Sequence, residues 1–337
     1  MRTRVRLAVT LGDPRGIGPE IVAAALCDPR VAAVDFVIVG PRGTMVEVDE
    51  AIGDWNPSHS VADAGRCAGL AVDRAIELAQ RGDVDGIVTA PLDKRALHAG
   101  GYDFPGHTEL LAARTGRRVA MMLAAMRPAP GTSTPLRVVL ATTHIALAEV
   151  PRALTWEAIA TAASVTREGL RRWFGIPEPR IALCALNPHA GDGARFGRED
   201  DDLLAPAARA AGLLGPFPAD TVFVRAMRGA FDAVIAPYHD VGMTAIKVAS
   251  FGSAVNVTLG LPFPRTSPDH GTALDIAGQG IADASSMIEA ILLCASIAAR
   301  SDEGDDKVTA GVAPADPQPN ADPRQASRSG GRASPSP

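Results

Sequence analysis

Three short apolar stretches, each running into a histidine, constrain the fold of this chain more than any other feature. The stretches are residues 136–140, 180–186 and 233–236, and the histidines that follow them are His144, His189 and His239. Such short runs, rich in β-branched residues, are typical of buried strands in a parallel sheet. Ligands of an open parallel α/β sheet bind beyond the carboxyl ends of its strands. The pattern therefore predicts an α/β sheet with three imidazoles near one of its edges.

Three imidazoles suit zinc or another borderline divalent metal, with coordination positions left open for a substrate. They converge if the three strands are neighbours in the sheet, or if the strands meet across a dimer. A single histidine near a strand end more often has a structural role. With three histidines at equivalent positions, the sequence favours a metal site and a structural role about equally.

The composition of the chain is that of an ordinary globular protein. Its 337 residues are 47% hydrophobic and 21% charged, which is enough for a sizeable core. The net charge of −5 and the lack of a basic stripe argue against nucleic-acid binding. No stretch approaches the ~20 uninterrupted apolar residues of a membrane-spanning helix. The short apolar run at the basic N-terminus predicts a first strand rather than a signal peptide.

The four cysteines are far apart in the chain and form no C-x-x-C pair. They are Cys27, Cys67, Cys184 and Cys294. Three of them lie in apolar contexts, which favours buried free thiols over disulfides. We therefore expect a cytoplasmic protein, because the cytosol keeps thiols reduced.

Strand and helix patterns alternate along the first part of the chain. Expected strands lie at residues 5–11, 35–40, 86–90, 119–124, 136–141, 180–186, 233–236 and 253–259. Expected helices lie at residues 21–27, 64–80, 155–174 and 201–212, with a last helix from 283 or 285 to 299. From Ser301 the composition changes to Asp, Pro, Ser, Gly and Arg with few large apolar residues. Such a tail cannot bury enough surface to offset chain entropy, so residues 301–337 are predicted to be disordered.

Polar residues gather in the segments that follow the expected strand at residues 86–90. Lys94, His107 and Thr108 could together hold a polar substrate. Alternatively, Thr108 only caps the helix that starts at Glu109. The residues alone leave these two interpretations open.

Two cations and an amide follow His239 closely in the sequence. Lysine and arginine together are suited to a phosphate or carboxylate group, so Lys247, Asn256 and Arg265 are candidates for a substrate site. The alternative is that these side chains are solvated at the surface, and Arg265 fits that alternative best. No Ser-His-Asp order or nucleophile elbow is present.

A co-linear series of motifs then indicates a family. Between residue 5 and about residue 299 the chain reads GDPRGIGPE, TAPLDK, FPGHTELLA, ATTHIAL, LNPHAGDG, GPFPADT, YHDVGMTAIK and VNVTLGLPFPRTSPDHGTALDIAGQG. These segments resemble the 4-hydroxythreonine-4-phosphate dehydrogenase (PdxA) family of vitamin B6 biosynthesis. A series this long covers nearly the whole expected ordered region and is highly specific.

The resemblance implies an α/β/α fold of two subdomains with the active-site cleft between them. This fold spans residues 1–300 and is related to isocitrate and isopropylmalate dehydrogenases. The resemblance also implies a homodimer with active sites at the subunit interface. Residues 270–280 are similar to the loop that carries the adenine end of NAD in decarboxylating dehydrogenases, which explains why no Rossmann fingerprint is present. Cofactor contacts are therefore expected at His270, Gly271, Thr272 and Asp275.

The resemblance also assigns the residues of the site. The family's metal-binding histidines fall on His144, His189 and His239, and its substrate-binding residues fall on His107, Thr108, Lys247, Asn256 and Arg265. The expected cofactors are NAD or NADP and one divalent metal per site, which is Zn2+, Co2+ or Mg2+. Our own candidates for proton transfer or for orienting the metal ligands are Asp220 and Asp240, and Lys247 is a further catalytic candidate.

The implied reaction oxidises the secondary alcohol of 4-phosphooxy-L-threonine with NAD. The resulting β-keto acid loses CO2 and gives 3-amino-2-oxopropyl phosphate. A divalent metal beside the hydroxyl lowers its pKa and then stabilises the enolate formed on decarboxylation. The substrate-binding residues are expected to hold the phosphate end and to fix the orientation of the substrate.

Two departures from the family pattern leave other functions open. Arg15 replaces the usual alanine of GDPAGIGPE, and Asp93 stands where asparagine is common. Both could mark a paralogue that acts on D-threonate or D-erythronate 4-phosphate in sugar-acid catabolism. A hypothesis of another class is a metal-dependent phosphohydrolase or lyase that uses the three histidines without a nucleotide. A third is a non-catalytic phosphometabolite sensor whose tail binds a partner.

Overall fold

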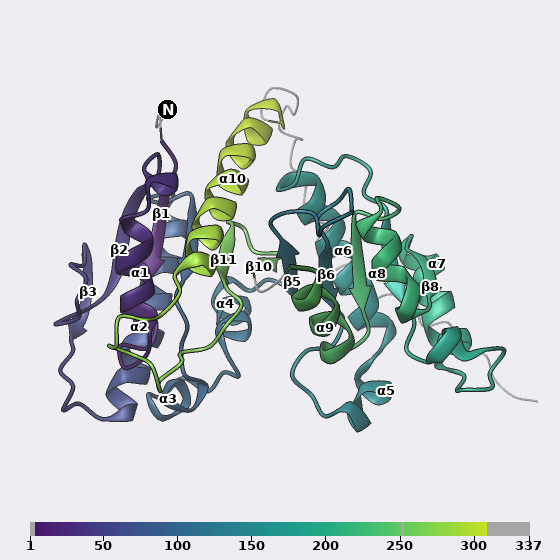
Figure 1. Ribbon diagram of the computed structural model, residues 1–337, viewed down its shortest axis with the longest axis horizontal. Helices are drawn as coiled ribbons and strands as arrows, with labels where there is room; N and C mark the ends of the chain where they lie inside the picture. Colours follow the sequence, from purple (N-terminus) through teal and green to yellow (C-terminus); the bar gives the residue numbers. More distant parts are fainter. Residues whose placement is uncertain (1–3, 251–252, 309–337) are drawn as a thin grey trace, which may run out of the picture.

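The computed structural model describes residues 4–250 and 253–308, with side chains as far as residue 300, and its centre is a large twisted sheet (Figure 1). Within these residues the strand order is β3-β2-β1-β4-β11-β10-β5-β6-β9-β7-β8. The strands are β1 (Arg6–Thr10), β2 (Asp35–Arg42), β3 (Glu50–Asp54), β4 (Gly86–Thr89), β5 (Ala120–Ala125), β6 (Arg137–Leu140), β7 (Ile181–Cys184), β8 (Leu214–Phe217), β9 (Ala233–Ala236), β10 (Ala254–Leu259) and β11 (Arg265–Pro268).

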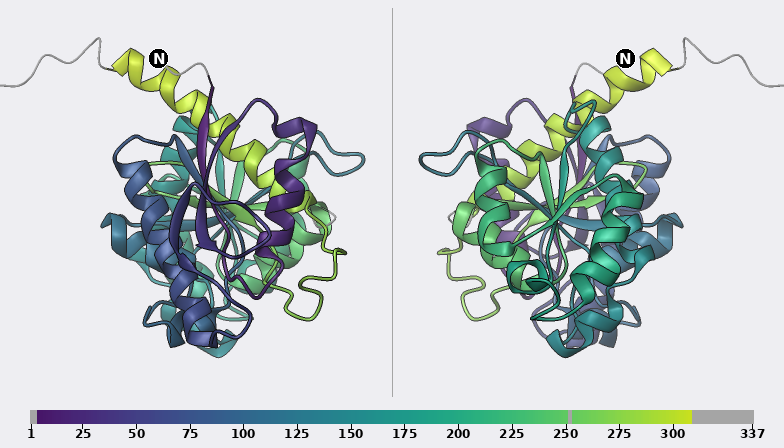
Figure 2. Two further views of the ribbon diagram at one scale, coloured as in Figure 1. Left: turned by 90° about the vertical axis from the view of Figure 1, so that its left-hand side faces the viewer. Right: turned by 90° about the vertical axis from the view of Figure 1, so that its right-hand side faces the viewer.

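Helices cover both faces of this sheet, as the two side views show (Figure 2). They are α1 (Gly18–Leu26), α2 (Val61–Gln80), α3 (Lys94–Ala99), α4 (His107–Thr115), α5 (Val150–Ala153), α6 (Trp156–Arg172), α7 (Ala205–Ala211), α8 (Ala219–Met227), α9 (His239–Ser250) and α10 (Ser285–Val308). Short 3-10 helices lie at η1 (Pro29–Val31), η2 (Leu147–Glu149) and η3 (Pro188–Gly191), and a π-helical turn at η4 (Asp200–Leu204).

The sheet has two parallel groups of strands joined by antiparallel pairs. Strands β3, β2, β1, β4 and β11 form one group, and β6, β9, β7 and β8 form the other. Between the groups, β10 and β5 pair antiparallel with each other and with their outer neighbours. The strands that precede the three candidate histidines are therefore neighbours, because β6, β9 and β7 lie side by side. The first of the two conditions given above for convergence, that the strands are neighbours, is therefore met.

Alternate residues of the central strands pack against helices on opposite faces of the sheet. In β1, Leu7 and Val9 belong to a core formed with α1, α6, α7 and α10, whereas Ala8 belongs to a core formed with α2 and α4. A third core, around Val138 and Val234, packs beneath α8 and α9. Burial on both faces explains why these strands read as continuous apolar runs instead of alternating patterns.

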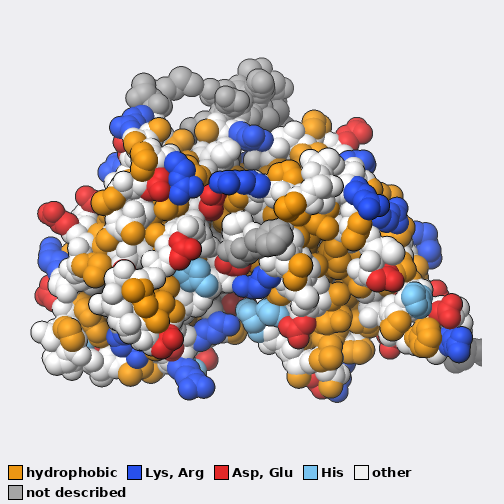
Figure 3. Space-filling model, viewed as in Figure 1, with side chains coloured by type: hydrophobic (Ala, Val, Ile, Leu, Met, Phe, Trp, Pro, Cys, Tyr) orange, Lys and Arg blue, Asp and Glu red, His pale blue; other side chains and the backbone are white. Residues whose placement is uncertain are grey.

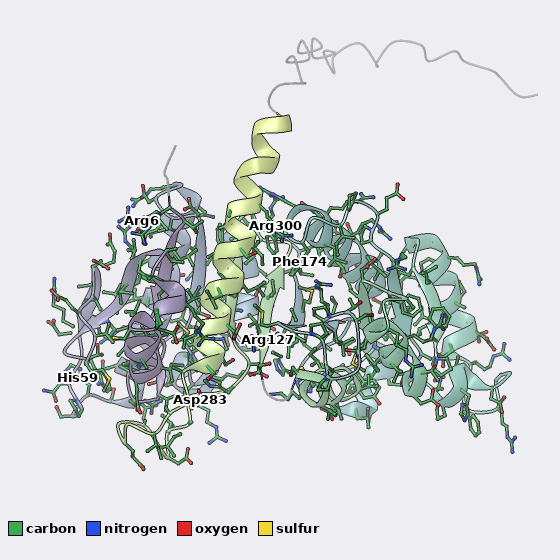
Figure 4. The ribbon with its side chains drawn as sticks, turned by 45° about the horizontal axis from the view of Figure 1, so that its top comes forward. Arg6, His59, Arg127, Phe174, Asp283 and Arg300 are labelled. Atoms are coloured by element: carbon green, nitrogen blue, oxygen red, sulfur yellow. The ribbon has the colours of Figure 1, made fainter. Side chains whose placement is uncertain are left out.

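Helix α10 crosses the middle of the molecule and contacts both halves of the sheet. Its Glu289 accepts hydrogen bonds from Arg30 at 3.4 Å, in the first half, and from Arg127 at 3.3 Å, in the second. Further along the helix, Arg300 donates to the carbonyl oxygen of Phe174 at 2.9 Å, and both residues are labelled in Figure 4. These contacts fix the helix across the junction between the two parallel groups.

The predicted elements are present close to their expected bounds, but the structure also contains β3, β11, α3, α5 and α9, which the sequence patterns do not predict. Sequence patterns do not predict β8 or α8, because the segment Gly215-Pro216-Phe217-Pro218 reads as a turn. Helix α10 continues past the expected end at Ala299 to Val308, so the start of the predicted disordered tail is helical. Residues 309–337 of that tail lie outside the described residues. None of the described helices combines the length and the apolarity needed to cross a bilayer.

Candidate active site

A cavity of about 400 Å3 lies beyond the carboxyl ends of β4, β6 and β9, at the junction of the two halves of the sheet. Figure 3 shows histidine side chains beside lysine or arginine side chains near the middle of the molecule. Most of the site residues predicted from the sequence line this cavity. They are His107, Thr108, His144, His239, Lys247, Asn256, Arg265, His270 and Gly271.

Arg265 gives the clearest indication of an anionic ligand. It is the first residue of β11 and is 1% exposed. Its Nη1 donates to Thr258 Oγ1 at 3.0 Å and its Nη2 to Thr89 Oγ1 at 2.5 Å, but the described structure gives the guanidinium no carboxylate partner. Burial lowers the pKa of Arg265 to about 10. A buried charge without a counter-ion is costly, so the surface-solvation alternative for Arg265 is wrong and an anion-binding role is favoured.

Four buried polar atoms around this cavity have no hydrogen-bond partner in the described structure. They are His107 Nε2, Asn256 Oδ1, Arg265 Nε and His270 Nε2. Buried polar groups are nearly always paired, so a cluster of unpaired ones indicates a place where a ligand completes the bonding. Burial, together with the positive charges of Arg265 and Lys94, holds the pKa of His107 well below its usual value. Its imidazole is therefore neutral at pH 7.

Thr108 does not cap helix α4. The helix begins at His107, its N-cap position is Gly106, and no side chain accepts a hydrogen bond from the first turn. His107 and Thr108 instead occupy that first turn and line the cavity. The capping alternative is wrong, and the position of Thr108 favours contact with a ligand.

His144 and His239 lie next to each other on one side of the cavity. Their ring centroids are 5.4 Å apart and the rings are tilted by 45°. Burial, and then the neighbouring charges of Lys94 and His239, lower the pKa of His144, which favours the neutral imidazole that binds metals. The Nδ1 of His239 is 2.8 Å from Asp240 Oδ1, a contact that orients the ring and leaves Nε2 for a ligand. This pair fits a divalent cation but provides only part of a coordination shell.

His189 lies apart from that pair, although it follows a strand of the same group. The turn after β7 holds His189 at a φ of 52°, and buried Asp200 fixes the turn by accepting hydrogen bonds from the amides of residues 186 and 187. His189 and Asp220 line a separate cavity of about 290 Å3. Within the described residues, no three His, Cys, Asp or Glu side chains are close enough to hold a metal ion. One subunit alone therefore does not bring the three predicted ligands together.

The cavity also contains charged groups whose pairing the sequence analysis does not predict. Lys247 Nζ pairs with Asp269 Oδ2 at 3.2 Å, and the Asp269 side chain is 4% exposed. Lys94 and Glu109 line the same cavity, and the described structure gives neither side chain an ion pair or a hydrogen bond. Pairing between residues far apart in the chain depends on the fold, so no local pattern could have shown it.

The four residues expected to contact a nucleotide lie along one segment but in different surroundings. His270 and Gly271 line the cavity described above. The carbonyl oxygen of Thr272 accepts a hydrogen bond from the Ile17 amide at 2.9 Å, which ties the segment to the loop after β1. Asp275 is exposed. The hydrogen bond of Thr272 thus holds this segment against the first half of the sheet. The contacts of the segment with a nucleotide stay a prediction.

A second cavity, of about 390 Å3, lies toward the other end of this segment. Its lining includes Arg15, Glu20, Trp55, Ala277 and Gly278. Arg15 Nε and Nη2 donate to the buried carboxylate of Asp13 at 3.0 and 2.7 Å, and this pairing raises the pKa of Arg15. Glu20 accepts hydrogen bonds from the amides of residues 278 and 282. The departure from the family pattern at Arg15 therefore affects the wall of this second cavity and not the first.

Comparison with known proteins identifies the family. The family profile described as "Pyridoxal phosphate biosynthetic protein PdxA" matches residues 23–294. The chain belongs to the PdxA family. Two curated PdxA relatives show how similar its members are to this chain. A 4-hydroxythreonine-4-phosphate dehydrogenase from Geobacter metallireducens is 42% identical over an alignment of 335 positions, which covers 88% of this chain and 96% of the relative. A Bradyrhizobium diazoefficiens relative, whose name proposes D-threonate 4-phosphate as its substrate, is 42% identical over an alignment of 337 positions, which covers 86% of this chain and 95% of the relative.

Solved structures agree with this membership. The crystal structure of 4-hydroxythreonine-4-phosphate dehydrogenase from Klebsiella pneumoniae matches with a TM-score of 0.74 and 38% identity, covering 88% of this chain and 98% of that one. Isocitrate dehydrogenase from Methylococcus capsulatus matches with a TM-score of 0.52 and 17% identity, covering 91% and 89%. The second likeness concerns the fold alone, and it confirms that the fold resembles that of isocitrate dehydrogenases, as predicted.

Proposed function

We propose that this PdxA protein is an NAD- or NADP-dependent dehydrogenase that also requires a divalent metal. It oxidises the secondary alcohol of 4-phosphooxy-L-threonine to a β-keto acid, which loses CO2 to give 3-amino-2-oxopropyl phosphate for pyridoxal 5′-phosphate biosynthesis. The main support is that Arg265, buried and without a counter-ion, shares a cavity with the adjacent imidazoles of His144 and His239. A phosphorylated hydroxy acid supplies both an anion for the guanidinium and oxygen atoms beside the imidazoles.

The phosphate group is assigned to the Arg265 end of the cavity. The guanidinium presents an unpaired N–H there, and a planar fork of donors matches the geometry of phosphate oxygens. Neutral His107 can donate one N–H to the same group, and Asn256 adds an amide whose oxygen and nitrogen exchange places by a half-turn. Thr108 and Lys247 line the same space. Together these groups would fix the position and orientation of the substrate.

A divalent cation is assigned to His144 and His239. The neutral state of His144 and the contact between His239 and Asp240 fit this assignment. When bound, such a cation supplies positive charge that lowers the pKa of a nearby alcohol and stabilises negative charge on oxygen. In this chain the two imidazoles would hold the ion, and Asp240 would orient His239. Zn2+ or Co2+ suits imidazole ligands best, and Mg2+ becomes suitable if the substrate adds oxygen ligands.

The third metal ligand is assigned to the second subunit of a homodimer. His189 is not near the pair within one chain, so the partner subunit's His189 would complete the coordination shell. Asp220 shares a cavity with His189 and would enter the same site with it, where it could orient a ligand or relay a proton.

Mixing two variants tests this shared site. His144→Ala and His189→Ala should each be inactive alone, but one of the two sites in a mixed dimer retains all three histidines. Random mixing should therefore restore roughly a quarter of wild-type activity. No recovery in a mixture shown to contain mixed dimers would contradict a site shared between subunits.

The nucleotide is assigned to residues 270–280. His270 and Gly271 line the substrate cavity while Ala277 and Gly278 line the second cavity, so one extended ligand along this segment could contact both. Thr272 and Asp275 lie between these ends. The described cysteines are free thiols, which supports the reducing cytoplasm as the location of the enzyme.

The experiment that tests the function measures NADH or NADPH formation by the purified protein. The substrates are 4-phosphooxy-L-threonine and the 4-phosphates of D-threonate and D-erythronate, each with and without a chelator. We expect turnover of the first, loss of activity with chelator, and recovery when metal is returned. The relative named for D-threonate 4-phosphate makes that compound the second candidate, and turnover of it alone would assign the paralogue function. Phosphate release without reduced nucleotide would instead support a phosphohydrolase.

A further inference from the structure

Lys94 is a positive charge in the active-site cavity without an assigned role. It is the first residue of α3, in the segment that follows β4, and it lines the cavity together with His107 and Arg265. Asp93 caps this helix by accepting a hydrogen bond from the Ala96 amide at 2.7 Å. The cap fixes where the helix starts and therefore where the backbone of Lys94 lies.

Lys94 is exposed to solvent at the mouth of the cavity, and within the described residues no carboxylate pairs with it. Lys247 already pairs with Asp269, and Glu109, the other carboxylate of the lining, does not pair with Lys94 in the described structure. Lys94 Cε and Glu109 Oε2 lie 3.7 and 3.6 Å from the point where a Cβ on Gly106 would be. Because glycine has no side chain, the space beside both charged groups stays open to a ligand.

We propose that Lys94 binds the carboxylate of the substrate, an inference that rests on the proposed function. The substrate has an anionic group at each end and the alcohol between them. Arg265 and its unpaired neighbours provide several converging groups for the oxygens of a phosphate, which leaves the single ammonium of Lys94 for the other anion of the substrate, the carboxylate.

The position of Lys94 supports this division of the two anions. Lys94 lines the same cavity as His107, at the phosphate end, and His144, in the imidazole pair. Lys94 is therefore within electrostatic reach of both ends of the site. In a β-hydroxy acid the carboxylate is only two carbons from the carbon that is oxidised, so a cation near the imidazole pair is placed to meet it.

This contact acts mainly on binding. When CO2 departs, negative charge leaves the carboxylate and passes to the enolate. A cation that holds the carboxylate therefore stabilises the bound substrate at least as much as the decarboxylation transition state. Loss of Lys94 should raise KM by roughly 10- to 100-fold, the usual effect of one charge-assisted hydrogen bond, and should change kcat much less.

Calorimetric titration of three variants tests the assignment. The variants are Lys94→Gln, Lys94→Arg and the control Arg95→Gln, which makes the same charge change at an exposed position of α3 outside the cavity lining. The full-length protein, with the divalent metal that supports turnover, is titrated with 4-phosphooxy-L-threonine and with sn-glycerol 3-phosphate, which has no carboxylate. We expect K94Q to bind the first ligand roughly 10- to 100-fold more weakly and the second as tightly as wild type. K94R should keep most of the affinity, and R95Q should match wild type for both ligands.

Each other outcome overturns a defined part of the reasoning. Equal weakening of both ligands in K94Q would show that Lys94 serves the phosphate, and unchanged binding of both would show that it contacts neither anion. Either result overturns the proposal while the dehydrogenase function stands. If the wild-type protein binds glycerol 3-phosphate but neither binds nor oxidises the threonine derivative, the proposed function itself fails and this inference fails with it.

Discussion

Replacing Arg265 by methionine should separate its contribution to ligand binding from its effect on folding. Burial lowers its pKa to about 10. This is roughly 2 to 3 pKa units below the usual value of a guanidinium, and each unit corresponds to about 1.4 kcal/mol. The charge therefore costs the unliganded fold roughly 3 kcal/mol. Methionine removes that cost but leaves the hydroxyls of Thr89 and Thr258 unpaired, at about 1 kcal/mol each. We expect R265M to be about 1 kcal/mol more stable than wild type, which raises Tm by roughly 2 °C for a chain of this size.

Ligand binding should change in the opposite direction. A charge-assisted hydrogen bond contributes about 1.5–3 kcal/mol, and a guanidinium can make two such bonds to one phosphate. The loss of both should lower kcat/KM by roughly 10²- to 10⁴-fold. Thermal unfolding with and without inorganic phosphate measures both effects in one assay. Phosphate should raise the Tm of the wild-type protein and leave the Tm of R265M unchanged.

Arg137→Met is the control for this experiment. Arg137 is also largely desolvated, but its guanidinium lies 4.8 Å from the ring centroid of Phe174 and donates to the carbonyl oxygen of Asp232, away from the cavity. R137M should lose stability and keep its kcat/KM. If R265M instead loses several kcal/mol of stability and keeps its response to phosphate, Arg265 is a structural residue and the assignment of the anion site is wrong.

Three further changes test other parts of the site. His107→Gln should make the protein less sensitive to acid, because the unfolded wild-type chain binds a proton at His107 that the folded protein does not. As the pH falls below ~6.5, the wild-type protein should lose up to about 1.4 kcal/mol more unfolding free energy per pH unit than the variant. Urea unfolding at several pH values measures this, and equal losses in the two proteins would refute it. Gly65→Ala should lower the free energy of unfolding by roughly 1–3 kcal/mol, because the new Cβ would lie 1.7 Å from the Ala96 carbonyl oxygen. An unchanged Tm in thermal unfolding would show that α2 and α3 tolerate the contact. Asp240→Asn should weaken metal binding by roughly 10- to 100-fold, because it alters the contact that orients His239. If a metal titration gives the variant and the wild-type protein equal affinities, Asp240 has no role in the site.

The arrangement of the second half of the sheet follows from the sequence. Residues 136–140, 180–186 and 233–236 are short and rich in β-branched or other apolar side chains because helices bury both faces of β6, β7 and β9. A histidine just after such a strand must lie near the same edge of the sheet. For His144 and His239 this was enough to place the rings side by side, at 5.4 Å.

Three features of the site depend on contacts that no local pattern specifies. His189 follows its strand as predicted, but the turn held by Asp200 directs it into another cavity. Arg265 fits a solvated surface position by residue type, yet pairing of β11 with β4 and β10 buries it beneath the cavity. Lys94 and Lys247 both line the cavity, but within the described residues only Lys247 is paired with a carboxylate. Each feature is a property of tertiary neighbours, so it could be found only from the structure.

The anion site and the imidazole site differ because they are built on different kinds of structure. Asn256 on β10 lies in register with Ser267 of β11 and Leu123 of β5, and Arg265 begins β11, so the sheet itself holds these groups. His144, in contrast, is on a loop. Side chains on strands keep their geometry more accurately than side chains on loops. A phosphate bound by the strands would therefore hold the substrate in a fixed position. The loops, the nucleotide and a second subunit would then place the reacting groups around it. Under the proposed function the site would have to admit a metal and two substrates, so it could not be closed beforehand. This would be a physical reason for one chain to form the anion site alone while its imidazole pair provides only part of a metal site.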